Sequence, residues 1–145
     1  MTRHLPVFVY GTLRPGGSNE HVFGSAARTH VPATLAGFEM VSNSSYPYIL
    51  SAQAGADGAP PLITGTLVFI AASDWSTTVN CLDELEGTDP RRPISDANLY
   101  NRVQKTVTAA DGSEHTAWVY IPPRIAQAGL RQRYRLVESG DWFKQ

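Results

Sequence analysis

The acidic segment at residues 82–86, Leu-Asp-Glu-Leu-Glu, offers carboxylates for general acid–base chemistry. On a helix that turns about 100° per residue, Glu86 lies roughly 20° from Trp75 and shares its apolar stripe, whereas Glu84 lies nearly opposite. An apolar face desolvates a carboxylate, and the carbonyl end of a helix disfavours negative charge, so the pKa of Glu86 should rise toward neutrality. If the helix frays at Glu86, the side chain reaches water instead, and helix geometry alone leaves both interpretations open.

A glycine-containing turn after the first apolar run is the second candidate. Gly11 ends the run at residues 7–10, and a sharp turn out of a strand leaves N–H groups unpaired and pointing the same way. Such a group of amides binds a carboxylate or a developing oxyanion. A phosphate-binding loop is not indicated, because Gly17 stands where that loop requires lysine. An ordinary strand-to-loop turn is the alternative interpretation.

The helix that must position the first candidate is predicted at residues 73–86. Ser73 or Asp74 can cap its start, and Gly87 stands where a left-handed residue ends many helices.

The rest of the chain reads mainly as short strands. Asp-Gly at residues 111–112 predicts a hairpin turn, residues 53–61 predict a surface loop, and a short helix can begin at Ser18 or Asn19. We expect a single α+β domain over residues 1–145, built on a small, mainly antiparallel β-barrel with one or two helices, rather than a doubly wound sheet. About six strands are predicted, from residues 7–10, 33–41 with a break at Gly37, 62–70, 100–107 and 116–121.

Composition limits the classes of function. The chain of 145 residues is 42% hydrophobic with a formal net charge of −1, which favours neither nucleic acid nor a membrane surface as a partner. Cys81 is the only cysteine, and the four histidines show no spacing typical of metal ligands. No apolar run approaches about 20 residues, and no signal-like apolar core precedes Pro6. We therefore expect a cytoplasmic protein, either a monomer or a homodimer, without a metal.

Several short motifs, taken in order, resemble the γ-glutamylcyclotransferase family in its AIG2-like branch. The opening Val-Phe-Val-Tyr-Gly-Thr-Leu-Arg at residues 7–14 resembles the family's first signature. Leu-Asp-Glu-Leu-Glu-Gly at residues 82–87, followed by Tyr-Asn-Arg at 100–102, is similar to its second. Tyr-Pro at 46–47, Gly-Thr-Leu at 65–67, Trp-Val-Tyr at 118–120 and Gly-Asp-Trp at 140–142 follow the same order.

The resemblance implies a compact barrel with a cavity between the first turn and the helix that carries Glu86. It implies a small-molecule γ-glutamyl substrate, whose free α-amine attacks its own γ-carbonyl and releases 5-oxoproline and an amine or amino acid. The family's catalytic glutamate matches Glu86, and its substrate-holding turn matches residues 10–13, Tyr10, Gly11, Thr12 and Leu13. The reaction requires no cofactor.

Four tyrosines are candidate walls of that cavity, with hydroxyls able to hold a carboxylate or an amine: Tyr46, Tyr48, Tyr100 and Tyr120. A half-buried core aromatic is the alternative for each of them. Arg102 is interpreted as a charge at a strand edge rather than as an inward partner.

Two departures from the simplest family members concern substrate choice. The loop at residues 88–99 is long and is a candidate lid or selectivity element, and the turn reads Gly-Thr-Leu rather than the Gly-Ser-Asn of the animal glutathione-pathway branch. A non-catalytic module that binds a small metabolite is the alternative function. The arginines at residues 131–135 are interpreted as a solvated surface rather than as a nucleic-acid site.

Overall fold

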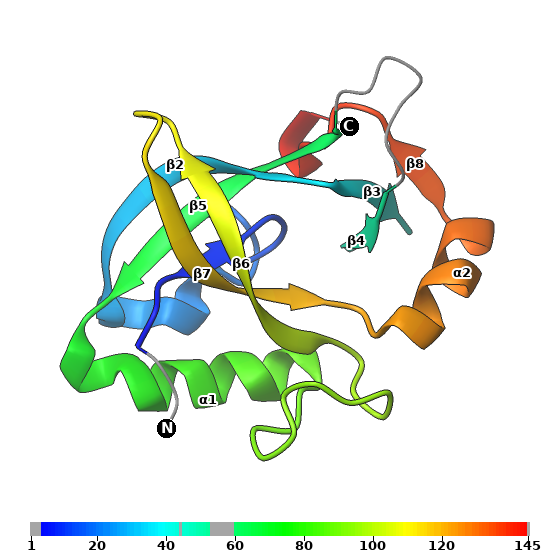
Figure 1. The fold of residues 1–145 in the computed structure, drawn as a ribbon. Helices are drawn as coiled ribbons and strands as arrows, with labels where there is room; N and C mark the ends of the chain where they lie inside the picture. The colour runs from blue at the N-terminus through cyan, green and yellow to red at the C-terminus, as the bar shows by residue number, and fades with distance from the viewer. Residues whose placement is uncertain (1–3, 44, 53–59, 145) are drawn as a thin grey trace.

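A computed structural model describes residues 4–43, 45–52 and 60–144. Five strands form a closed barrel (Figure 1). The first strand pairs antiparallel with one neighbour, where Val7 faces Val68, and parallel with the other, where Val7 faces Trp118, and this parallel pair closes the barrel. In order around the barrel the strands are β1 Val7–Val9, β5 Leu62–Ile70, β2 Ala27–Ala36, β6 Asn101–Ala109 and β7 Glu114–Ile121.

A second, three-stranded sheet lies beside the barrel. Its strands, in order, are β4 Pro47–Ser51, β3 Phe38–Ser42 and β8 Arg135–Val137. Gly37, where a break in the second strand is predicted, is the point at which the chain passes from β2 in the barrel to β3 in this sheet. The helix α2 Arg124–Arg133 covers the second sheet through Leu130, which packs with Val41 and Leu50.

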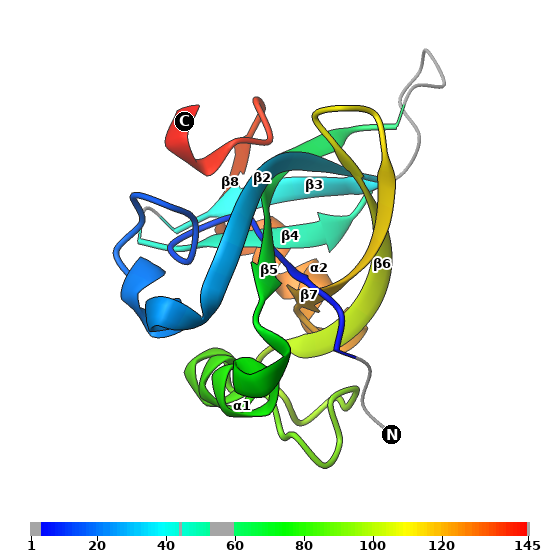
Figure 2. The ribbon, with the colours of Figure 1, turned by 90° about the vertical axis from the view of Figure 1, so that its left-hand side faces the viewer.

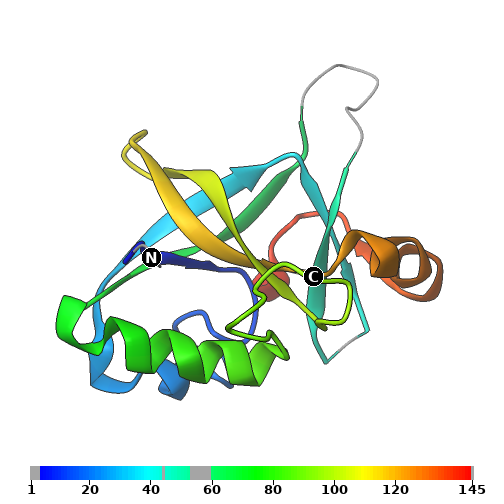
Figure 3. The same ribbon diagram turned by 60° about the horizontal axis from the view of Figure 1, so that its bottom comes forward.

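The helix α1 Trp75–Glu86 crosses one end of the barrel, below it in Figures 2 and 3. A short 3-10 turn, η2 Ala72–Asp74, leads into it, and Gly87 ends it in the left-handed conformation, with φ 66°. The predicted apolar stripe is confirmed, because Trp75, Val79 and Leu82 are buried in one cluster with β1. Glu84 is exposed.

Most predicted elements are present, and several were missed. The strands at residues 62–70 and 116–121 and the hairpin at 111–112 are confirmed. The short helix after residue 19 is the 3-10 helix η1 Glu20–Ala26, and another, η3 Trp142–Lys144, ends the described chain. The strands β4 and β8 and the helix α2 were not predicted.

Two further predictions meet the structure only in part. The predicted loop at 53–61 falls mostly outside the described residues. Within the described ranges, no helix combines the length and apolar character needed to cross a membrane.

Candidate active site

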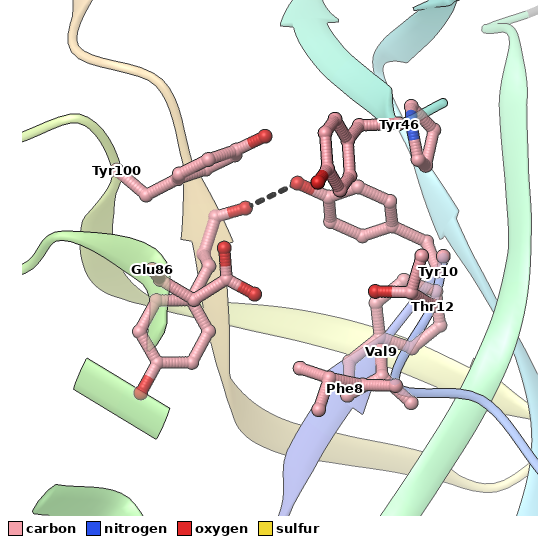
Figure 4. Close-up of a pocket in the computed structure, with 11 residues that line it drawn as sticks. Phe8, Val9, Tyr10, Thr12, Tyr46, Glu86 and Tyr100 are labelled. Carbon is pink, nitrogen blue, oxygen red and sulfur yellow. Dashed lines mark hydrogen bonds between the residues drawn. The ribbon is translucent and has the colours of Figure 1, made fainter. Parts of the chain in front are cut away.

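A cavity of about 50 Å³ lies between the turn after β1 and the end of α1 (Figure 4). Residues 10–13 form one wall, and Glu86 faces them from the last residue of α1. Tyr46, Tyr100 and Tyr120 complete the polar part of the lining. The structure therefore brings together Glu86, the turn and three of the four tyrosines nominated as walls, whereas Tyr48 does not line the cavity.

Glu86 is the one charged side chain in this lining. Among the described residues, no side-chain or backbone group donates a hydrogen bond to its carboxylate. Burial raises the pKa of Glu86 from 4.5 to about 7. A carboxylic acid with such a pKa can exist in either protonation state at neutral pH, which is the property that general acid–base chemistry requires.

The turn opposite presents free donors. The N–H of Arg14 donates to the carbonyl of Gly11 across 3.0 Å, which defines a tight turn over residues 11–14. The N–H groups of Gly11, Thr12 and Leu13 lie outside the strand, and no acceptor for them occurs among the described residues. Three unpaired amides in one turn beside a cavity can bind an anion.

Residues near and far in sequence hold this turn in place. Asn19 donates two hydrogen bonds to Thr12, one from its N–H to the carbonyl at 2.8 Å and one from its Nδ2 to Oγ1 at 2.9 Å. Gly17 passes so close that an added Cβ would lie 2.3 Å from the Thr12 carbonyl oxygen, so a side chain there would displace the turn. Arg14 pairs with Asp141 at 2.7 Å and anchors the turn to the C-terminal segment.

All six tyrosines of the chain gather at this site. Tyr48, which does not line the cavity itself, stacks between Tyr100 and Tyr134 with ring centroids 5.9 and 5.5 Å away. Burial is the largest cause that raises the pKa of Tyr10, Tyr100 and Tyr120 above the ordinary value of 10.0. Their hydroxyls therefore remain neutral donors at any pH at which Glu86 titrates.

The prediction for Arg102 was wrong. This residue is 4% exposed, and its guanidinium donates to both carboxylate oxygens of Asp83, at 2.9 Å from Nε and 3.3 Å from Nη2. The reason is the start of β6, where consecutive residues Asn101 and Arg102 are both buried, so simple alternation fails. Asp83 was also missed, because on the helical wheel it falls beside the apolar stripe rather than on it.

The loop at residues 88–99 is held from within. The side chain of Asn98 accepts a hydrogen bond from the N–H of Asp89 and donates one to the carbonyl of Arg92. The side chain of Asn101, at the start of β6, accepts a hydrogen bond from the N–H of Ser95. None of residues 88–99 lines the cavity, but Tyr100, which directly follows the loop, does. Its role as a lid or selectivity element stays a prediction.

The profile of the family described as gamma-glutamyl cyclotransferase, AIG2-like, matches residues 7–144. The chain belongs to this family. The match spans both signatures, the turn that opens the cavity and the helix end that carries Glu86.

A curated relative agrees with this assignment. A gamma-L-glutamyl-butirosin B gamma-glutamyl cyclotransferase from Niallia circulans is 29% identical over 119 residues, which make up 79% of this chain and 65% of the relative. The chain thus spans less than two thirds of the length of that curated relative.

Solved structures show the same AIG2-like fold. An AIG2-like protein from Mus musculus superposes with a TM-score of 0.62 at 20% identity, covering 95% of this chain and 88% of the mouse chain. The protein YkqA from Bacillus subtilis gives a TM-score of 0.63 at 20% identity, covering 97% of this chain and 40% of its own.

Proposed function

We propose that this protein is a γ-glutamyl cyclotransferase that releases 5-oxoproline from a γ-glutamyl amine or γ-glutamyl amino acid. The observation that carries the proposal is that Glu86, with a pKa near 7, opens into the same cavity as the unpaired amides of residues 11–13. The family assignment and the activity named for the Niallia circulans relative support it.

In the proposed reaction the α-amine nitrogen of the substrate attacks its own γ-carbonyl carbon. Glu86 as carboxylate accepts a proton from the amine, and the new carbon–nitrogen bond produces a tetrahedral oxyanion. The protonated Glu86 then returns the proton to the departing nitrogen as the original amide bond breaks. The products are 5-oxoproline and the free amine, water is neither consumed nor released, and Glu86 ends as it began.

The turn and the tyrosines supply binding and orientation. The amides of residues 11–13 suit the substrate carboxylate or the developing oxyanion, both of which carry negative charge. Because the attack is intramolecular, a small cavity that folds the glutamyl chain on itself contributes through proximity. We assign contact with the leaving amine to Tyr46, which is half exposed at 52%, and to the stack of Tyr100, Tyr48 and Tyr134 beside it.

An assay of the purified protein against γ-glutamyl amines and γ-glutamyl dipeptides tests the proposal, with 5-oxoproline measured by mass spectrometry. We expect 5-oxoproline from at least one of these compounds, at a rate that depends on enzyme concentration and disappears in Glu86→Gln. Binding of these compounds without any cyclised product would contradict catalysis and favour the non-catalytic binding module.

A further inference from the structure

Behind the last turn of α1, a buried acid receives three hydrogen bonds from two strands of the barrel. Asp83, 1% exposed, accepts two from Arg102 on β6 and one from the Tyr120 hydroxyl on β7, the last at 2.6 Å. Arg102 also lies with its guanidinium carbon 4.6 Å from the centre of the Trp118 ring. Asp83 and Arg102 do not line the cavity, so they cannot act on a bound substrate directly.

Asp83 stands three residues, nearly one helical turn, before Glu86. Its side chain ties the helix to the barrel, and its backbone carbonyl accepts the N–H of Thr88 at 2.8 Å just beyond the helix. Thr88 in turn donates through Oγ1 to the carbonyl of Tyr100 at 2.7 Å. Glu86 therefore lies between two residues, Asp83 and Thr88, that are both held by hydrogen bonds.

The same connection reaches the opposite wall. The carbonyl of Tyr120 accepts the hydroxyl of Tyr10 at 2.6 Å, so one residue of β7 is bonded to Asp83 through its side chain and to Tyr10 through its backbone. Tyr10 immediately precedes the amides of residues 11–13. Asp83 near the end of α1 and Tyr10 at the start of the turn are thus both bonded to the same residue of the barrel, Tyr120.

We propose that Asp83, Arg102 and Tyr120 form a positioning network that sets the depth of the Glu86 carboxylate in the cavity and its distance from the turn. A buried ion pair is a weak source of stability compared with apolar packing, whereas two-point contact between guanidinium and carboxylate defines orientation well. We therefore assign to this ion pair the role of orienting the nearby acid, Glu86. The consequence for turnover rests on the proposed function, but the placement of Glu86 does not.

Because the groups that face Glu86 are uncharged near pH 7, the pKa of Glu86 indicates how deeply its carboxylate is buried. They are tyrosines on each surrounding element: Tyr10 after β1, Tyr48 on β4, Tyr100 before β6 and Tyr120 on β7. All are neutral near pH 7, and the charge of Asp83 is balanced by that of Arg102. A change in the pKa of Glu86 in a charge-neutral variant therefore reflects a change in its burial.

The test is a carbon-13 NMR titration of the Glu86 carboxyl in the full chain, with its signal identified by its loss in Glu86→Gln. The double variant Asp83→Asn/Arg102→Gln removes both charges together, and Tyr120→Phe removes one hydroxyl without changing charge. In both, we expect the pKa to fall from about 7 toward 4.5, more in the double variant. We expect kcat to fall about 100-fold in the double variant and about 10-fold in Tyr120→Phe, with KM within about 3-fold, because misplacement by 1 Å has effects of this order.

The matched control is Glu39→Gln/Arg131→Gln, which removes an ion pair of similar length from the surface, 2.7 Å against 2.9 Å for Asp83 and Arg102. It should change neither the pKa of Glu86 nor kcat. A pKa still near 7 in a folded network variant would overturn the inference, and Tyr120→Phe decides the matter if the double variant does not fold. If the wild-type protein turns over no γ-glutamyl compound, the proposed function fails, while the titration still judges the network.

Discussion

The hydroxyl of Tyr10, the residue after β1, donates to the backbone carbonyl of Tyr120 on β7 across 2.6 Å, and β1 and β7 pair in parallel. Its donor, Tyr10, directly precedes the turn whose amides are unpaired. Its acceptor residue, Tyr120, also contacts Asp83. The two walls of the cavity are therefore parts of one connected structure.

Replacing the acid should remove activity and leave the fold. We expect Glu86→Gln to lower kcat by at least about 1,000-fold, because the amide can neither accept nor return the proton. Glu84→Gln is the matched control, since Glu84 precedes Glu86 by two residues but is exposed, and it should retain activity within about 2-fold. Production of 5-oxoproline measures both, and equal losses in the two variants would contradict the assignment.

The pH dependence of kcat/KM should report the free Glu86. Because the carboxylate is the form that accepts the proton, the rate should fall about tenfold per pH unit below the pKa of Glu86, which burial raises to about 7. Initial rates across pH, with the protein shown to stay folded by circular dichroism, provide the measurement. An acid limb centred near 4.5 instead would mean that Glu86 is not desolvated in the free enzyme.

Burial of the same acid should make stability depend on pH. The folded pKa of about 7 exceeds the ordinary 4.5, so the folded state binds the proton more tightly, and the stability present below 4.5 is lost as pH rises through 7. A difference of about 2.5 pH units at about 1.4 kcal/mol each sets an upper bound between about 3 and 4 kcal/mol, of which we expect about 2 for this partly exposed side chain.

Glu86→Gln lacks this titration, which gives a direct comparison. Relative to the wild type, its free energy of unfolding should rise by about 2 kcal/mol from below pH 4.5 to above pH 7, as measured by urea denaturation. Parallel stability curves for the two proteins would show that Glu86 has the same pKa folded and unfolded.

The turn should bind anions through its backbone. Titration with glutamate or 5-oxoproline should shift the amide NMR signals of residues 11–13 more than those of other residues. Gly11→Ala should weaken this binding about 10-fold or more, because its Cβ would lie 2.6 Å from Pro47 Cγ, and Pro47 lines the cavity. Gly129→Ala in α2 meets nothing closer than 3.7 Å and should bind as the wild type does. Shifts spread evenly over the surface would argue against a site at the turn.

The tyrosine stack should influence which amine leaves. Tyr100→Phe keeps the ring against Tyr48, whereas Tyr100→Leu removes the stack, so only the second should change the ranking of γ-glutamyl amines by kcat/KM. We expect changes of about 10-fold for the most affected amines, consistent with the loss of one aromatic contact. An unchanged ranking in Tyr100→Leu would place the leaving amine elsewhere.

Local patterns in the sequence determined much of this protein. Helical periodicity placed Glu86 on the inner face and Glu84 outside, and Gly87 marked the helix end, because these depend only on neighbours within one or two turns. The strand at β5 and the hairpin at residues 111–112 follow from composition and turn chemistry of the same short range. The helix α2 escaped prediction because Leu130 is its only buried residue, which leaves almost no periodic signal.

Tertiary structure alone decided the partners of these elements. Asp83 and Arg102 are 19 residues apart, and Tyr10 and Tyr120 are 110 apart. Whether such pairs meet depends on how the strands register around a closed barrel and on where α1 crosses its end, and no local pattern encodes either. For that reason the acid could be nominated from its own helix, while the residues that hold it in place became visible only once the barrel was closed.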